Sequence, residues 1–152
     1  MSEWAAVAAM RFVEQESQSL ETWAVAQRRH ETLLTQAPRM WEAIRIALKE
    51  QVRCFNAQVG REVLILTAMA EKRVIGQARL ENGRRMMCAD FDSKAWFVTF
   101  STYSIDGIID FQERFSMRID AEENVAVSTN KTNGLQPDQV AEQMLNALLG
   151  WK

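Results

Sequence analysis

The chain has 152 residues, of which 47% are hydrophobic and 25% charged, a composition typical of one folded domain and unlike that of a disordered protein. Its formal net charge is −2, so it has no general attraction to phosphate backbones and we expect no nucleic-acid partner. No run approaches the roughly 20 apolar residues that cross a membrane. The apolar start at Trp4 follows Glu3 instead of the basic residues of a signal peptide. We therefore expect a cytoplasmic protein without membrane contact.

The first sixty residues carry apolar groups at helical spacing and contain one proline. They predict a first helix from about Ser2 to Thr35. Pro38 predicts the start of a second helix, Pro38–Val59, because proline suits the first helical position. Gly60 ends it, since glycine tolerates the left-handed conformation of a helix stop. Two apolar stripes define these helices: Val13, Leu20, Trp23, Gln27, His30 and Leu34 in the first, and Trp41, Ile44, Leu48, Val52, Phe55 and Val59 in the second.

After Gly60 the pattern changes to short apolar runs divided by turn signals, which is typical of strands. Six strands are predicted, at about 63–70, 73–81, 84–91, 95–103, 108–120 and 125–129. Their connections are short enough for hairpins, so the sheet should be an antiparallel meander. Pro137 opens a last helix that ends near 149. The prediction is one α+β domain over 1–152: two N-terminal helices (1–59), a six-stranded antiparallel meander sheet (61–129) and a C-terminal helix (137–149) packed on the sheet.

No set of catalytic residues can be recognised, and the sequence favours a protein that is not an enzyme. His30 is the only histidine and lies on an apolar stripe. Cys54 and Cys88 lack the spacing of metal ligands, so we expect two reduced thiols, no metal and no cofactor. There is no glycine-rich phosphate loop. Arg84 and Arg85 follow a hairpin turn and are predicted to be a solvated strand start.

One carboxylate interrupts an apolar row. Strict alternation along 109–119 places Glu113 on the same face as Phe111 and Phe115. A buried carboxylate there would be paired, protonated or functional, unless a β-bulge turns it outward. This allows an alternative function: a small-ligand-binding protein or enzyme with a cavity between sheet and helices. Glu113 would polarise that cavity, and its lining would be Trp96, Phe100, Phe111 and Phe115.

The leading hypothesis rests on surplus apolar surface. The fourth strand carries rings on both faces, so it is either covered twice or exposes rings that a partner covers. The first helix is apolar around much of its circumference near its start. One core cannot easily hide all of these groups. We therefore expect a non-enzymatic protein-interaction module that forms a two-fold homodimer and could also bind another protein, with interface residues Trp4, Val7, Trp23, Phe97 and Tyr103.

Overall fold

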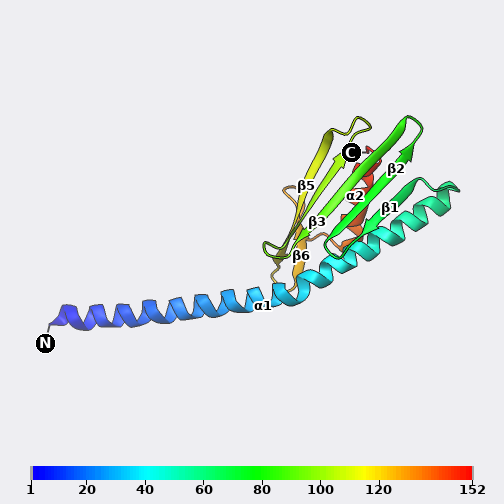
Figure 1. Ribbon diagram of the computed structural model, residues 1–152. Coiled ribbons are helices and arrows are strands. Elements are labelled where there is room, and N and C mark those ends of the chain that lie inside the picture. Colours follow the sequence, from blue (N-terminus) through cyan, green and yellow to red (C-terminus); the bar gives the residue numbers. More distant parts are fainter. Residues whose placement is uncertain (1, 152) are drawn as a thin grey trace.

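The computed structural model describes residues 2–151 and shows an α+β fold (Figure 1). The six strands form one antiparallel sheet in sequence order, and this confirms the predicted meander with its C-terminal helix. The elements are α1 (Glu3–Val59), β1 (Leu64–Met69), β2 (Arg73–Leu80), β3 (Gly83–Asp92), β4 (Phe97–Tyr103), β5 (Ile109–Ile119), β6 (Val125–Ser128) and α2 (Pro137–Leu148).

The predicted division of the N-terminal region into two helices is wrong, because α1 continues through Pro38. Proline removes the N–H that would bond to the carbonyl of Leu34, and its ring crowds that carbonyl. Leu34 and Pro38 are both exposed, so water can reach the freed carbonyl. The residues before the proline include no glycine that could turn the chain. The helix instead bends where it reaches the sheet (Figure 1), as proline-containing helices do.

The core lies between one face of the sheet and the two helices. Alternate residues of β2, β3 and β6 are buried, which is the pattern of a sheet covered on one side. α2 packs against the central strands β3 and β4, while α1 contacts α2, β1 at one end of the sheet and β5 and β6 at the other. The sheet therefore curls around the helices. The largest fully buried side chains include Phe100, Phe115, Ile44, Leu48, Leu64, Met87 and Met144.

Polar side chains hold the second half of α1 against the first hairpin. The indole Nε1 of Trp41 donates to the backbone oxygen of Glu71 at 2.7 Å. The amide of Asn56 donates to the carbonyl of Leu64 at 2.8 Å and accepts from its N–H at 3.0 Å. These bonds satisfy backbone groups that would otherwise be left unpaired beside the apolar core.

The first half of α1 projects away from the sheet (Figure 1). Every residue from Glu3 to Glu31 is exposed apart from Ala8, which is half-buried. Leu33 already packs against the core, and the side-chain oxygen of Gln36 accepts from the N–H of Val125 at 3.1 Å. We call residues 3–34 the helical arm. At 1.5 Å per residue it is about 50 Å long.

Leu48 should be a main stabilising residue of the fold, because its side chain is fully buried between α1 and the sheet. Leu48→Ala should lower the free energy of unfolding by about 2–5 kcal/mol, as expected for a cavity in a packed core. Ile46→Ala is the matched control, since Ile46 lies on the same helix and is 61% exposed. Urea unfolding measures both. Equal losses in the two variants would contradict the packing described here.

Candidate protein-interaction surface

The helical arm carries large apolar side chains that nothing in the described chain covers. Trp4 is 77% exposed, and Leu20 and Trp23 are each 65% exposed. Soluble proteins seldom leave so many large apolar groups uncovered on one element unless they form a binding surface. The full set is Trp4, Val7, Met10, Phe12, Val13, Leu20, Trp23, Val25 and Leu34.

The apolar face of the arm continues the face that α1 buries against the sheet. Leu20, Gln27, Leu34, Trp41 and Leu48 follow one another at intervals of seven residues. Trp41 and Leu48 are buried, whereas Leu20 and Leu34 are exposed. Apart from Gln27, this row is a seven-residue apolar repeat, the pattern of a helix that packs along another helix in a left-handed coiled coil. One half of the repeat is therefore covered within the chain and the other half is free.

The arm has little internal support as an isolated helix. Its side-chain pairs are limited to a 3.5 Å hydrogen bond from Gln27 to Glu31, and no ion pair forms between residues 3 and 34, all of which the structure describes. Long helices that stand alone in water depend on many such pairs, and most others depend on packing. The arm is thus expected to gain stability when its apolar face is covered.

The rings predicted to line a ligand cavity pack against one another instead. Phe100 and Phe115 are fully buried, with ring centroids 6.4 Å apart in an edge-to-face arrangement. Phe111 is 40% exposed and meets Phe100 in the same way at 6.0 Å. Trp96 lies in the turn between β3 and β4 and packs on Phe91 at 6.5 Å. Phe100 and Phe115 therefore form part of the core, Trp96 packs against that core beside Phe91, and Phe111 lies at its exposed edge.

Glu113 lies opposite Phe100 in the sheet register, on the face that carries the core, as the alternation predicts. It is half-buried, because β6 pairs only with residues 116–119 and leaves this part of β5 without a neighbour on one side. Its side chain borders a depression that is open to solvent, between β5, the 129–132 turn and the end of α2. The described residues form no enclosed cavity around Glu113.

The two predicted interface residues on β4 lie on the sheet face opposite the helices. The guanidinium of Arg114 covers the ring of Phe97, 4.1 Å from its centroid. Tyr103 is half-buried and borders a shallow hollow with Met86 and Ile105. Trp4, Val7 and Trp23 are all exposed on the arm, with Trp23 19 residues further along the helix than Trp4. The five predicted residues therefore form two separate surfaces, and the arm is the more exposed of them.

A partly buried ion pair anchors the end of α2, and the sequence interpretation missed it. The side chain of Arg85 is only 13% exposed. It contacts Asp110 at 2.6 Å and donates to the carbonyls of Leu148 at 2.9 Å and Ala147 at 3.2 Å. Thr102 donates to the other oxygen of Asp110 at 2.6 Å. The predicted solvated position of Arg85 is wrong: its cation neutralises the negative end of the helix.

The signal for this cluster was present in the sequence. Alternation along β3 places Arg85 on the same face as Met87, Ala89 and Phe91, which are all buried. The hydrogen bond from Arg85 lowers the pKa of Asp110, and the bond from Thr102 adds to this effect. An arginine in a core-facing row requires an acidic or carbonyl partner. Here the partners come from a distant strand and from α2, which a sequence pattern does not identify.

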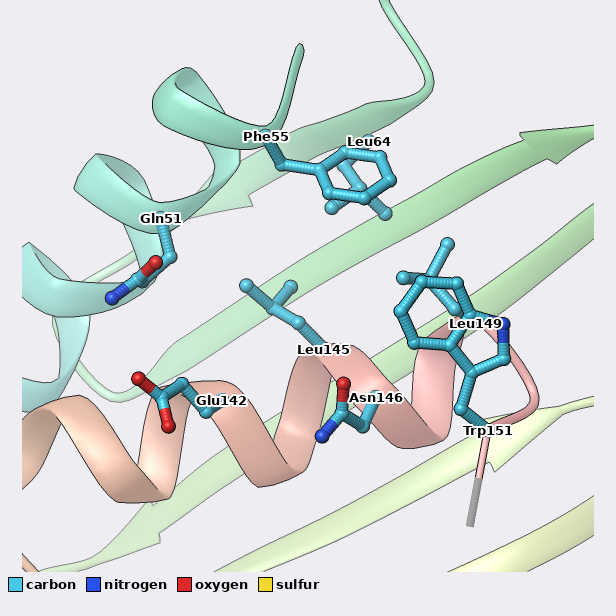
Figure 2. A pocket seen from close by; sticks show the side chains of 8 residues that line it. All are labelled: Gln51, Phe55, Leu64, Glu142, Leu145, Asn146, Leu149 and Trp151. Atoms are coloured by element: carbon cyan, nitrogen blue, oxygen red, sulfur yellow. The ribbon is translucent and has the colours of Figure 1, made fainter. Parts of the chain in front are cut away.

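A small pocket of about 230 Å³ opens between α1 and α2 (Figure 2). Gln51 and Glu142 lie at one end of it, and Leu149 and Trp151 lie at the other (Figure 2). Its volume is below the roughly 300–1,000 Å³ of common small-molecule sites. We therefore place no ligand site between the two helices.

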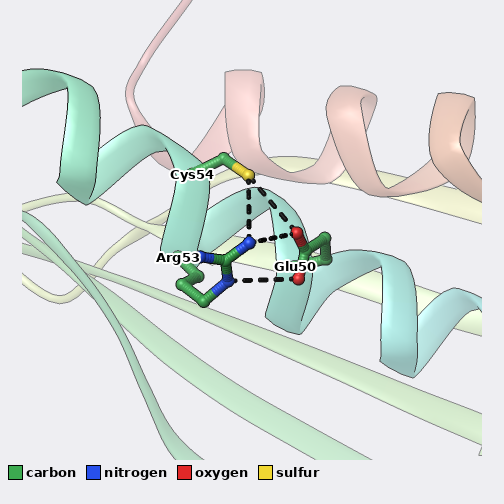
Figure 3. Close-up of polar contacts among 3 residues, drawn as sticks. All are labelled: Glu50, Arg53 and Cys54. Atoms are coloured by element: carbon green, nitrogen blue, oxygen red, sulfur yellow. Dashed lines mark hydrogen bonds and ion pairs between the residues drawn. The ribbon is translucent and has the colours of Figure 1, made fainter.

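The two cysteines differ in exposure. Cys54 is exposed on α1 beside an ion pair in which Arg53 contacts Glu50 at 2.5 Å, and the thiol itself lies 3.5 Å from Glu50 (Figure 3). The hydrogen bond from Arg53 lowers the pKa of Glu50. Cys88 is half-buried on β3, and burial raises the pKa of its thiol. Both cysteines are free, and residues 2–151 contain no group of three or more metal-ligating side chains.

The chain has no significant match to any protein-family model, any curated protein or any solved structure. Among the described helices, none combines the length and the apolar character needed to cross a membrane.

Asp110→Asn should lower the free energy of unfolding by about 1–2 kcal/mol at pH 7, because it leaves the Arg85 cation without its charged partner. The range allows for solvent screening of Asp110, whose side chain is 34% exposed. The pKa of Asp110 is depressed in the folded state. Its stabilisation is therefore present above the unfolded pKa of about 3.9 and is lost as the pH falls through the lower folded value. Urea unfolding of both proteins from pH 7 to pH 2.5 should show the difference closing at the acid end.

The exposed Asp106→Asn serves as the control for the loss of one carboxylate, and it should leave the free energy of unfolding at pH 7 nearly unchanged. A difference between Asp110→Asn and the parent protein that stays constant down to pH 2.5 would show that the charge on Asp110 is not what stabilises the end of α2.

Cys54 should react at least about tenfold faster than Cys88 with a thiol reagent at neutral pH, since the thiolate is the reactive form and access limits the rate. Cys54 is exposed, whereas Cys88 is half-buried with a raised pKa. Stopped-flow absorbance with Ellman's reagent should resolve two phases. The fast phase should disappear in Cys54→Ser and the slow phase in Cys88→Ser; two equal rates would contradict the structure.

Proposed function

We propose that the protein is a non-enzymatic interaction module that self-associates as a two-fold homodimer through its helical arm. The observation that carries this proposal is the seven-residue apolar repeat that leaves the sheet at Leu34 and continues uncovered through Leu20. Such a repeat fits a partner helix laid along the arm. The two free thiols fit a reducing compartment such as the cytoplasm.

The composition of the arm supports docking of another protein segment. Trp4, Phe12 and Trp23 are aromatic and highly exposed, and aromatic side chains supply much of the binding energy at protein interfaces. In a closed two-fold dimer, the same apolar patch of each chain is covered by the other chain. No unpaired apolar patch is then left to bind a third chain.

A ligand-binding or enzymatic role at Glu113 has less support. Phe100 and Phe115 are fully buried in the core, so neither ring borders the hollow that Glu113 lines. Glu113 faces an open depression, where water screens its charge and lowers its value as a polarising group. We therefore favour the interaction module over the alternative.

The double substitution Leu20→Glu with Trp23→Glu should abolish dimer formation. It places two charges on the apolar face of each arm, and losses at aromatic anchors of about 2 kcal/mol or more each should raise the dissociation constant at least about a hundredfold. Size-exclusion chromatography with light scattering measures the mass. The parent should approach twice the 17.4 kDa of one chain at micromolar concentration, and the variant should remain at that single value.

The control places the same charges on the opposite side of the arm, with Gln15→Glu and Gln18→Glu. This variant should dimerise like the parent, because its substituted positions face away from the apolar repeat. Urea unfolding should show the sheet intact in both variants, since these positions do not contact it. A parent protein that stays at 17.4 kDa while its concentration rises tenfold would overturn the proposal.

A further inference from the structure

We propose that the two arms of the dimer run antiparallel, in a register that places Leu20 of each chain against Trp23 of the other. This inference rests on the proposed function and specifies its geometry. Along the apolar face, one set of positions is Val13, Leu20, Gln27 and Leu34, and the second set is Ala9, Glu16, Trp23 and His30. In an antiparallel coiled coil, residues of the first set meet residues of the second set in shared layers.

The polar residues of the face decide the direction. Glu16 lies on the repeat, one turn before Leu20. In a parallel pair, Glu16 would meet Glu16 of the second copy, and two facing carboxylates repel each other in a partly buried layer. In the antiparallel register, Glu16 meets Gln27, whose amide can donate a hydrogen bond to the carboxylate. Glu16 and Gln27 then share one layer, while His30 meets Val13 in the next. The pairing of Glu16 with Gln27 disfavours the parallel alternative.

Small residues flank the central layers in the same register. Ser17 of one chain lies beside Ala24 of the other, and Ser19 lies beside Ala26. Small flanking side chains let two helix backbones approach closely and leave room for the large indole of Trp23. Because the register is symmetric, each of these contacts occurs twice in the dimer.

The length of the arm also fits this register. Ala9 meets Leu34 of the second copy, so the pairing covers the arm up to the point where α1 reaches the sheet. Trp4 and Val7 then lie beyond Leu34 of the second copy, next to the bend at Pro38. An arm tip that is apolar around most of its circumference needs covering on more than one side. In this arrangement the second copy provides both its arm and the adjoining end of its sheet.

Disulfide trapping tests the direction and the register. The background is the full chain with Cys54→Ser and Cys88→Ser, checked for parent-like dimer mass. Ser17→Cys and Ala24→Cys proteins are prepared separately and oxidised alone or as an equimolar mixture. We expect a covalent dimer in the mixture at least about tenfold faster than in either protein alone, because only the mixed pair brings two thiols within bonding distance. Gln15→Cys mixed with Thr22→Cys is the outward-facing control and should not be trapped.

Each outcome decides the proposal. Rapid trapping of Ser17→Cys by itself would show antiparallel arms in another register, because residues at this flanking position face each other only in an antiparallel pair. A dimer by light scattering that is trapped neither in the Ser17→Cys and Ala24→Cys mixture nor in Ser17→Cys alone would show parallel arms or a further register. Both results overturn this inference and leave the interaction module in place. If both the parent and the cysteine-free background protein are monomers by light scattering, the proposed function is overturned as well.

A charge substitution gives an independent measurement. Gln27→Lys places an ammonium group against Glu16 of the second copy, twice per dimer, in the antiparallel register. Sedimentation equilibrium should then show a dissociation constant lower by about fivefold, from two favourable pairs of modest strength. In a parallel dimer, the introduced ammonium groups of the two chains would face each other and binding would weaken. Gln18→Lys carries the same charge on the outer face and should leave the dissociation constant unchanged.

Discussion

The structure depends on one apolar face of α1. Within the sheet-covered half of the helix, Trp41, Ile44 and Leu48 close the core between α2 and strands at both ends of the curled sheet. The same seven-residue repeat then runs out along the arm, where no described residue covers it. The same repeat of α1 therefore serves packing inside the chain and the proposed packing between chains. The bend near Pro38 separates the half that packs on the sheet from the arm.

A second constraint acts at the opposite end of the fold. Arg85 stands at a core-facing position of β3, where an apolar side chain would be expected. It contacts Asp110 and the last carbonyls of α2. An ion pair with a buried member contributes little net stability compared with apolar packing, but a buried charge without its partner is strongly unfavourable. The arrangement therefore specifies where α2 ends on the sheet. Alternative placements of α2 would leave the guanidinium without partners.

Much of the fold could be predicted from the sequence because local signals agreed with the final packing. The strand boundaries followed from alternation and turn residues, and alternation also placed Glu113 on the core-facing side of β5. Two features could not be predicted. The continuity of α1 depends on solvent access to the backbone beside Pro38. The role of Arg85 depends on contacts with groups far away in the sequence. Both features depend on the surroundings of a residue in the folded structure, which a local sequence pattern does not contain.

The continuity of α1 also shapes how the arm would bind. Because the buried half of the helix is already formed and fixed by Trp41 and Asn56, the arm extends from an existing nucleus and avoids the cost of starting a helix. Its far end, near Trp4, has few side-chain pairs to hold it. Binding would therefore order the distal turns last and stabilise them most. The arm therefore offers a partner a helical surface that is already formed where it joins the sheet, which lowers the ordering cost of binding near Leu34.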